Sequence, residues 1–490
     1  MIEPTNTDPV IFHTAKDAVD NLCLRYETAT TFLKNQFDEF LQGKTDGARY
    51  RAYYPEIMME STSFARIDSR LSFGHVSGPG TYSTTITRPD LFREYLEHQL
   101  GLLIENHGIS VAVGNSTTPL PIHFAFEEGA SIDEVAVGSQ ETIIRDVFDT
   151  PDLAFMDDRI VNGDIDFSSS EPAPLAPFTA PRVDYSLHRL AHYTGTSPMH
   201  FQNFVLFTNY QFYVDRFIEF AEQALLDVNS VYEEFVAPGN RITCREDCSQ
   251  LQANAAHLSR MPQMPAYHLK TGKRSGITLV NIGVGPSNAK TITDHVAVLR
   301  PHTWIMLGHC AGLRKTQSLG DYVLAHGYVR EEHVLDEDIP ISVPVPPLAE
   351  VQVALQEAVA ETTGLSGYDL KNIMRTGTVA TIDNRNWELR DQRGPVKRLS
   401  QSRAIALDME SATIAANGFR FRVPYGTLLC VSDKPLHGEL KLPGMASEFY
   451  RTQIGRHLLI GIRTLEKLRE MPTERLHSRK LRAFNETAFQ

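Results

Sequence analysis

The spacing of apolar side chains changes several times within the first part of the chain, and each change predicts a different element. Between residues 14 and 42 they recur at steps of three and four, which predicts a helix. Residues 62–90 alternate and are rich in threonine, which indicates strands, and a second helix is expected from Pro89. The runs Ile109–Val113 and Ile122–Phe126 are typical of two more short strands. This part is therefore predicted to be α+β.

A proline-rich segment follows. Residues 168–181 hold four prolines, a density that disfavours both helix and sheet. Two domains are also expected from the length of 490 residues, since single cores stop growing near ~250–300 residues. We therefore place a boundary near residue 180, between an N-terminal α+β domain (1–180) and a second domain (181–490).

In the second part, short apolar runs alternate with glycine turns and helical stretches. Strands are predicted at Phe204–Phe207, Ile277–Ile282, Thr303–Leu307, Asp321–Ala325, Gly377–Ile382, Ala404–Leu407 and Gly426–Val431. The helix after Leu407 is expected to end before Gly418, and a long helix is expected over about 446–469. This rhythm predicts an α/β domain around a mixed, mostly parallel sheet, in which ligands bind at the carboxyl ends of the strands.

Charge and cysteine content narrow the functional classes. The chain has 47 Lys and Arg against 60 Asp and Glu, a formal charge of −13, so a nucleic-acid or anionic-membrane partner is not expected. Five cysteines are too few, and odd in number, for a disulfide scaffold, which indicates a reducing, cytoplasmic compartment. Neither a signal peptide nor an apolar run of membrane-spanning length is present in this sequence.

Several common motifs are incomplete. Gly283-x-Gly285 lacks the third glycine of a dinucleotide fingerprint, and neither a phosphate-binding GxxxxGK[ST] motif nor a GxSxG motif occurs. Cys244 and Cys248 have His257 nearby, but a structural zinc needs four ligands at tighter spacing. We therefore predict no metal site, and two ordinary thiols.

Three segments combine polar groups with strand ends. They are Asp408-Met-Glu410-Ser-Ala, Val431-Ser-Asp433-Lys-Pro and Gly308-His309-Cys-Ala-Gly312, and Asn209 follows another strand. Taken alone, Asp433 is explained as a turn cap and Glu410 as a first-turn acid facing a helix dipole. The glycines of the third segment would let backbone N–H groups approach a ligand. Together, the segments predict a site at one edge of the sheet.

This combination resembles the nucleoside phosphorylase and nucleosidase superfamily over roughly residues 185–470. The chain resembles the AMP nucleosidase family more closely, over nearly its whole length. The similar stretches are Gly78–Pro89, Val205–Tyr210, Leu279–Lys290, Asp408–Gly444 and Leu476–Glu486. The resemblance implies a phosphorylase-like catalytic domain and hydrolysis of AMP to adenine and ribose 5-phosphate.

The resemblance also implies roles for individual residues. Asp433 would protonate N7 of the departing adenine, which requires a pKa raised by burial or by a neighbouring anion. Glu410 would accept hydrogen bonds from the ribose hydroxyls and stabilise the cation-like sugar, with Met409 packed beneath the ring. Met409 is equally explained as an ordinary core residue.

The chain departs from the phosphorylase pattern at the phosphate site. Two arginines of phosphorylases align with Tyr213 and Met306, which carry no charge, so water is expected to replace phosphate as the nucleophile. Asn209, Gly308 and His309 are candidates for the water site, and His309 could orient the water. Which group holds the water, and whether any group acts as a base, is left open.

Substrate groups beyond the ribose have several candidates. For the 5′-phosphate they are Arg189 and His192, with Lys434, Arg88 and Arg479 as alternatives. Arg385, Asn386 or Trp387 would contact adenine, and Trp387 is also explained as a core residue.

We therefore expect an enzyme, an N-glycosyl hydrolase of AMP salvage. The resemblance implies a cytoplasmic homohexamer that is allosterically activated by MgATP, inhibited by phosphate and regulated by its N-terminal domain, with no cofactor needed for the chemistry. The alternatives are a purine nucleoside phosphorylase that uses inorganic phosphate and a non-catalytic nucleotide sensor.

Overall fold

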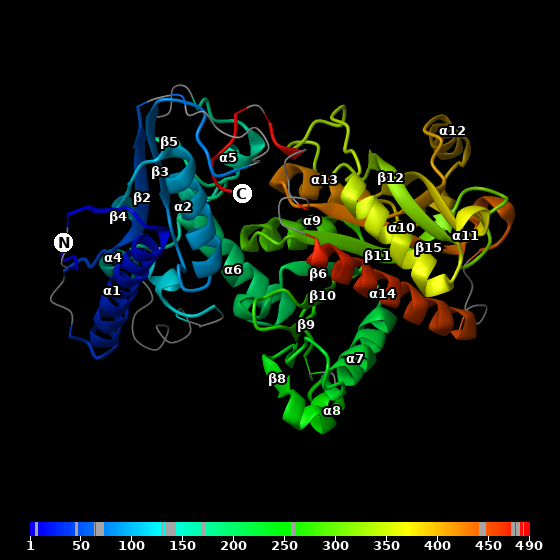
Figure 1. Ribbon diagram of the computed structural model, residues 1–490, viewed down its shortest axis with the longest axis horizontal. Helices are drawn as coiled ribbons and strands as arrows, with labels where there is room; N and C mark the ends of the chain where they lie inside the picture. The colour runs from blue at the N-terminus through cyan, green and yellow to red at the C-terminus, as the bar shows by residue number, and fades with distance from the viewer. Residues whose placement is uncertain are drawn as a thin grey trace. The chain divides into compact units, whose positions relative to one another are not determined.

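The computed structural model divides into two compact units (Figure 1). The first contains residues 1–189 and 482–490, and the second contains residues 190–481. The chain passes from one to the other within helix α6 (Ala180–Thr194), downstream of the boundary proposed near residue 180. The structure describes residues 1–4, 8–44, 48–62, 64, 73–128, 132, 144–167, 172–255, 258, 260–440, 447–471, 476, 481–483 and 485–490.

The first unit is a five-stranded sheet covered by a long helix. The sheet has the order β1-β4-β2-β3-β5, and all its pairings are antiparallel except β3–β5. Helix α1 begins after Thr14, whose hydroxyl accepts the Asp17 N–H at 3.2 Å, and it packs on β2 and β4. The elements are β1 (Val10–Phe12), α1 (Ala15–Leu41), β2 (Tyr53–Ser61), β3 (Gly80–Thr85), α2 (Arg93–His107), β4 (Val111–Pro119), α4 (Ile144–Val147), α5 (Arg159–Asn162) and β5 (Ala173–Pro174).

The predicted α+β character of this unit is confirmed, with two local differences. Ile122–Phe126 is not a strand: residues Ile122–Ala125 form a 3₁₀ helix that follows Pro121. Proline lacks the N–H that continues a strand ladder, so the chain turns here. Strand β2 lies before the stretch predicted at 62–90, and residues 63 and 65–72 of that stretch lie outside the described part.

The second unit is built on a ten-stranded mixed sheet, as predicted. Its order is β14-β13-β12-β15-β11-β6-β10-β9-β7-β8. The central pairings β15–β11, β11–β6 and β6–β10 are parallel, whereas the flank from β10 to β8 is antiparallel. The strands are β6 (Phe204–Thr208), β7 (Glu234–Ala237), β8 (Arg241–Cys244), β9 (Ala266–Lys270), β10 (Ile277–Asn281), β11 (Thr303–Gly312), β12 (Tyr322–Glu331), β13 (Met374–Ile382), β14 (Ala406–Asp408) and β15 (Tyr425–Asp433).

One end of this sheet closes on itself. Strand β14 pairs with β13 and also with the last residues of β11, through Ala311↔Leu407 and Gly312↔Ala406. The five strands β11, β15, β12, β13 and β14 therefore form a closed ring, which leaves no exposed edge there.

Helices cover the sheet, and α14 packs on α10 and α7 (Figure 1). The helices are α7 (Gln211–Leu226), α8 (Leu251–Ala255), α9 (Pro286–Val296), α10 (Ala349–Thr363), α11 (Gly367–Ile373), α12 (Arg393–Gln401), α13 (Ser411–Phe421) and α14 (Ser447–Glu470). In the described part of the chain, no helix combines the length and apolar character needed to cross a bilayer.

Two glycine segments differ from expectation. Gly308–Gly312 is not a turn but the second half of β11, because β15 and β14 pair with it on either side. Helix α13 does not end before Gly418 but continues to Phe421. A Cβ atom at Gly418 would lie 2.5 Å from the Tyr425 ring, so this glycine permits close packing of the helix on β15 instead of ending the helix.

Candidate active site

The carboxyl ends of four strands bring the predicted polar residues to one edge of the second unit. Asn209 follows β6, Asp408 ends β14 and Asp433 ends β15. Ala311 of β11 lies opposite Leu407 on one side and Asp433 on the other. Since neighbouring strands are ~4.8 Å apart, the ends of β14 and β15 are separated by about 10 Å across β11.

Two donors hold the Glu410 side chain at this edge. It is 1% exposed and occupies the N-cap of α13. Its Oε1 accepts the backbone N–H of Gly285 at 2.7 Å, and its Oε2 accepts Nδ2 of Asn209 at 2.9 Å. Gly285 has φ 119° and Gly283 has φ 67°, conformations that glycine adopts without strain. The Gly-x-Gly turn therefore presents an N–H group to the carboxylate.

Asp408 is a second buried acid, two residues before Glu410. Its Oδ1 accepts the Thr381 hydroxyl at 2.5 Å, and its Oδ2 accepts the backbone N–H of Ser411 at 2.9 Å. Burial raises the pKa of Asp408, and burial together with the charge of Asp408 raises the pKa of Glu410 to about 8. The two acids therefore share an environment that disfavours two negative charges.

Asn209 has one polar atom that the fold does not satisfy. Its Oδ1 is buried and makes no hydrogen bond within the described structure. A Cβ atom at Gly308 would lie 2.8 Å from Cε of Met306 and 3.3 Å from this oxygen, so a side chain at 308 would crowd both. A buried acceptor without a donor is costly, which makes this oxygen a binding point for a water or a substrate hydroxyl.

His309 lies between two tyrosines. Its ring centroid is 4.8 Å from that of Tyr210 and 5.7 Å from that of Tyr213. The Tyr213 hydroxyl is 2.7 Å from Nδ1 of His457 on α14, and Nε2 of His457 is 3.0 Å from the Leu428 carbonyl. Burial lowers the pKa of His457 to about 3, so this imidazole is neutral, donates from Nε2 to Leu428 and accepts from Tyr213. Tyr213 is thereby fixed as one wall around His309.

Asp433 and Lys434 point to different partners. The Ser432 hydroxyl donates to Oδ1 of Asp433 at 2.5 Å. Nζ of Lys434 donates to the Gln317 carbonyl at 2.9 Å and pairs with Glu439 at 2.7 Å. The ammonium of Lys434 therefore has partners other than the Asp433 carboxyl, namely a backbone carbonyl and Glu439.

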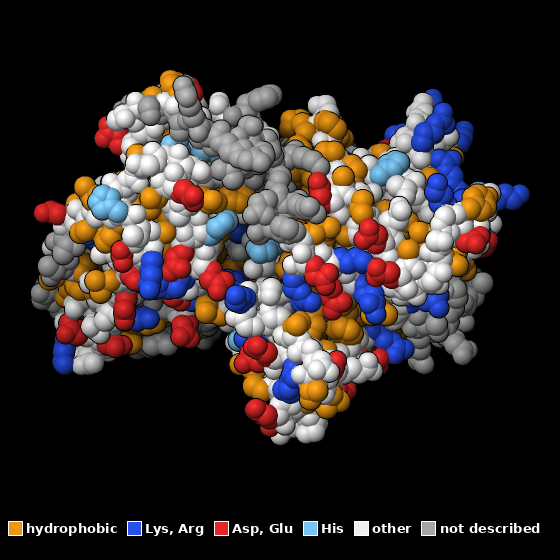
Figure 2. All heavy atoms as spheres, viewed as in Figure 1, with side chains coloured by type: hydrophobic (Ala, Val, Ile, Leu, Met, Phe, Trp, Pro, Cys, Tyr) orange, Lys and Arg blue, Asp and Glu red, His pale blue; other side chains and the backbone are white. Residues whose placement is uncertain are grey.

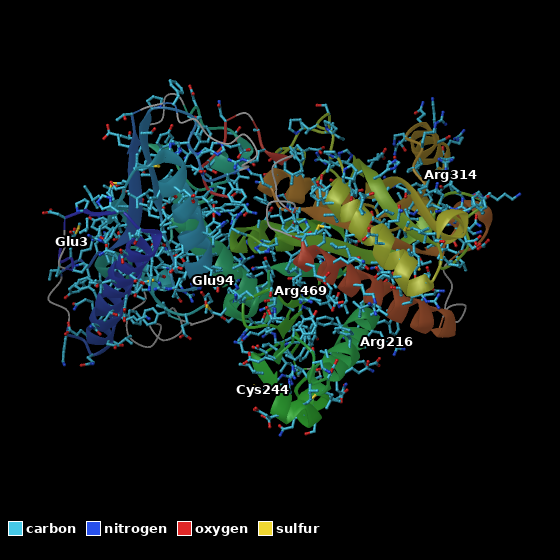
Figure 3. All side chains as sticks on the ribbon, viewed as in Figure 1. Glu3, Glu94, Arg216, Cys244, Arg314 and Arg469 are labelled. Carbon is cyan, nitrogen blue, oxygen red and sulfur yellow. The ribbon has the colours of Figure 1, made fainter. Side chains whose placement is uncertain are left out.

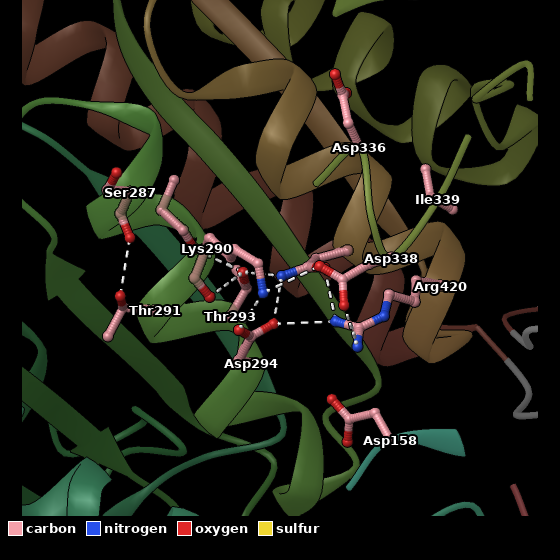
Figure 4. A network of polar contacts seen from close by, with 12 residues as sticks. Asp158, Ser287, Lys290, Thr291, Thr293, Asp294, Asp336, Asp338, Ile339 and Arg420 are labelled. Atoms are coloured by element: carbon pink, nitrogen blue, oxygen red, sulfur yellow. Dashed lines mark hydrogen bonds and ion pairs between the residues drawn. The ribbon is translucent and has the colours of Figure 1, made fainter. Parts of the chain in front are cut away.

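A partly buried ion-pair network joins the two helices that begin at the site. Asp294 of α9 accepts from Lys290 at 2.9 Å, from Asn417 at 2.9 Å and from Arg420 at 3.2 Å, the last two residues being on α13 (Figure 4). Asp338 pairs with Arg420 at 3.0 Å and with Lys290 at 3.2 Å. Because α9 follows the Gly283–Gly285 turn and α13 follows Glu410, the network fixes the geometry of the Glu410 site.

The five candidates for the 5′-phosphate are spread over both units. Arg88 pairs with Glu128 and Asp90 in the first unit. Arg189 is half-buried at the last position of the first unit, and His192 is exposed three residues later in the second. Lys434 has the partners given above, and Arg479 lies outside the described residues. The candidates that the structure describes therefore belong to two different units, and they do not form one cluster within either unit.

The candidates for the adenine pocket follow β13. Arg385 and Asn386 are exposed, whereas Trp387 is 8% exposed and packs with Leu313, Leu399 and Leu407. Trp387 therefore belongs to a small core that also lines a cavity of about 240 Å³ beside α12. Lys and Arg side chains gather on the surface over α12, so a locally cationic surface exists despite the negative net charge (Figure 2).

The cysteine pair stands apart from this edge. Cys244 ends β8 (Figure 3), and the Cys248 thiol contacts the Glu222 carbonyl at 3.5 Å. Both are free thiols, and His257 lies outside the described residues. In the described part of the chain, no group of three or more His, Cys, Asp or Glu side chains is placed to hold a metal ion.

Sequence reasoning missed three contributors to the site. The Gly285 N–H was signalled by the Gly-x-Gly turn after β10, although that motif was considered only for dinucleotides. Asp408 lies in the Asp408-Met-Glu410 segment, for which the sequence analysis proposed roles for Met409 and Glu410 but none for Asp408. No sequence signal indicates the pairing of Tyr213 with His457, because they are 244 residues apart.

Two family models match the chain. One, described as Bacterial AMP nucleoside phosphorylase N-terminus, matches residues 17–172, and the other, described as Phosphorylase superfamily, matches residues 249–452. With the α/β fold and the site at its strand ends, the second unit is a phosphorylase-superfamily domain. The AMP nucleosidases of Escherichia coli K12 and O157:H7 are each 47% identical over 491 residues, which cover 97% of this chain and 98% of the relative. The chain belongs to the AMP nucleosidase family.

Solved structures with lower similarity were also found. The crystal structure of AMP nucleosidase from Bacteroides thetaiotaomicron is 28% identical with a TM-score of 0.43, and the match covers 59% of this chain and 98% of that one. Purine nucleoside phosphorylase from Toxoplasma gondii is 16% identical with a TM-score of 0.40, over 56% of this chain and 97% of that one.

Proposed function

We propose that this protein hydrolyses the N-glycosidic bond of AMP to adenine and ribose 5-phosphate. Its membership of the AMP nucleosidase family, at 47% identity over 97% of the chain, supports this activity. The observation that carries the chemistry is a carboxylate, Glu410, held by two donors at a strand edge that also carries Asp433. In this proposal Asp433 supplies the acid that protonates the departing adenine, and Glu410 supplies the anion that stabilises the sugar.

Asp433 acts as the general acid. Loss of adenine as an anion is slow, and protonation at N7 removes that difficulty, which typically contributes ~10²–10⁴-fold. The Ser432 hydroxyl on Oδ1 orients the Asp433 carboxyl, so the transferable proton is expected on Oδ2.

Glu410 stabilises the sugar. As C1′ develops positive charge, a carboxylate fixed by Gly285 and Asn209 needs no reorganisation, and its attraction grows in the transition state. In this proposal the same oxygens accept hydrogen bonds from the ribose 2′- and 3′-hydroxyls. Met409, half-buried beside Glu410, packs under the ring.

Water attacks from the Asn209 side. In this proposal the unsatisfied Oδ1 of Asn209 accepts a hydrogen bond from the water, and His309 orients it. Tyr213 and Met306, which align with phosphorylase arginines, are both fully buried and uncharged. They supply no cation for inorganic phosphate, which favours water as the nucleophile.

Arg189 and His192 bind the 5′-phosphate in this proposal, and the segment Arg385–Trp387 borders adenine. Arg88, Lys434 and Arg479 remain alternatives for the phosphate.

The test is product analysis in H₂¹⁸O. Incubation with AMP is expected to release adenine and to place ¹⁸O on C1 of ribose 5-phosphate, with or without phosphate. Formation of ribose 1-phosphate from adenosine or inosine in the presence of phosphate would instead support the phosphorylase alternative. Tight AMP binding without release of adenine would support the sensor.

We also propose a cytoplasmic homohexamer in AMP salvage, allosterically activated by MgATP and inhibited by phosphate. Family resemblance supports the assembly and the regulation, and five free cysteines are compatible with a reducing compartment. Light scattering should give six times the 54.9 kDa chain mass. Adenine release should rise with MgATP and fall with phosphate. A monomer, or a rate indifferent to both effectors, would contradict these proposals.

A further inference from the structure

The first unit contains a cavity of about 660 Å³ that the proposed chemistry does not use. Three arginines line it: Arg49 and Arg51, from the segment before β2, and Arg145 of α4. Every residue of its lining belongs to the first unit, so it is separate from the Glu410 edge. Its size suits a ligand of nucleotide dimensions.

The charges around this cavity are arranged for an anion. Asp149 is shared by two arginines, because Arg51 contacts both of its oxygens at 2.7 and 2.8 Å and Arg49 contacts Oδ1 at 2.7 Å. The other lining acid, Asp152, accepts the backbone N–H of Ala154 at 2.9 Å. Among the lining residues that the structure describes, three guanidiniums therefore face two carboxylates, and both carboxylates already have donors.

Arg145 is the guanidinium that remains available. It is exposed and makes no hydrogen bond or ion pair with any residue that the structure describes. A guanidinium presents several N–H donors in a planar fork that matches phosphate oxygens. An exposed guanidinium beside two fixed ones is suited to a phosphate group.

The remaining walls are apolar. Phe148 lies at the base of the first unit's core, while Leu153 and Phe155, 79% and 45% exposed, belong to a short 3₁₀ helix. Met156 and four prolines complete this lining. Exposed aromatic and aliphatic groups next to a polar cluster are typical of a binding site for a ligand that has one flat apolar part and one charged part.

From this combination, we infer that the cavity binds a nucleoside phosphate, with the phosphate on Arg145 and the base against Phe155. Pro181 also lines the cavity and belongs to the first turn of α6, whose last residues lie in the second unit. A ligand there contacts the helix that links the cavity to the catalytic unit. The cavity would be the site of the MgATP activation proposed above. Binding of a ligand there does not depend on whether the second unit hydrolyses AMP.

The test is hydrogen–deuterium exchange of the full chain with ATP as the probe. ATP should slow exchange in peptides covering residues 144–156. Arg145→Ala should raise the ATP concentration for half-maximal slowing at least about tenfold, the cost of one charged hydrogen bond. Arg159→Ala is the matched control, because Arg159 is exposed, pairs with Asp157 and is absent from the lining, so it should leave the response unchanged.

Adenosine and inorganic phosphate, each alone, should give little slowing in residues 144–156. No response of these peptides to ATP, or an equal response in Arg145→Ala, would overturn the site. A full response to adenosine or to phosphate alone would overturn the ligand class. Adenine release from AMP without ATP should be the same in Arg145→Ala and wild type. AMP should also slow hydrogen–deuterium exchange in peptides covering residues 408–411, which reports on the catalytic site separately.

Discussion

Nδ2 of Asn209 donates a 2.9 Å hydrogen bond to Oε2 of Glu410, although 201 residues separate them in the chain. The bond uses the Asn209 amide N–H and leaves its carbonyl oxygen unsatisfied on the side of Gly308. In the proposed mechanism, this one side chain therefore holds the carboxylate that faces the sugar and presents an acceptor for the attacking water.

The acid limb of the pH profile should report Glu410. Its pKa is raised to about 8, so below that pH the free enzyme carries a proton on the carboxyl and kcat/KM for AMP should fall as pH decreases. Burial and the charge of Asp408 both raise this pKa, so Asp408→Asn, which removes the second cause, should move the limb toward acid. Asn209→Asp adds a charge and should move it toward alkali. Adenine release across pH 5–9 gives the profiles; shifts in the same direction would contradict the assignment.

Asp433→Asn should lower turnover by at least ~10²-fold while AMP still binds, because the amide cannot supply the N7 proton. Single-turnover adenine release and equilibrium AMP binding give the two quantities. Asp369→Asn, an exposed acid on α11, is the control. Turnover near that of the control would remove Asp433 as the acid.

Arg189→Ala and His192→Ala should reduce the preference for AMP over adenosine. Loss of one charged hydrogen bond to phosphate is worth ~1.5–3 kcal/mol, so the ratio of kcat/KM values should fall about 10–100-fold. Arg393→Ala, a 90% exposed residue on α12, should leave the ratio unchanged. An unaltered ratio in both variants would assign the 5′-phosphate to Arg88, Lys434 or Arg479.

Tyr213→Phe should destabilise the protein by about 1–3 kcal/mol, because it leaves Nδ1 of the fully buried His457 without its donor. Urea unfolding of Tyr213→Phe, His457→Phe and the double variant gives the coupling energy. Tyr368→Phe, at a 78% exposed tyrosine, is the control. Additive effects of the two substitutions would show that the hydrogen bond contributes nothing.

The sequence predicted regular elements well where a period persisted. The helix predicted at 14–42 is α1 (Ala15–Leu41), and the strand predicted at 204–207 is β6 (Phe204–Thr208). Predictions failed where partners from elsewhere decide the conformation. Gly308–Gly312 is extended because β14 and β15 pair with it, and α13 passes Gly418 because that glycine packs on Tyr425.

Site residues followed the same division. Glu410 and Asp433 were proposed from their motifs, because each motif lies within a few residues of a strand end. The Gly285 N–H, the unsatisfied oxygen of Asn209 and the Tyr213–His457 pair were not, since each depends on contacts between segments far apart in the chain.

By itself, then, the amino-acid order determined the α/β character of the second unit, the family resemblance and the acids at its strand ends, because periodicity and short motifs are local properties. Only the tertiary structure decided which donors hold each acid, which acceptor is left without a donor and that three arginines line a cavity in the first unit. Hydrogen bonds and desolvation depend on distances of a few ångströms between remote segments, and those distances exist only once the sheets have closed.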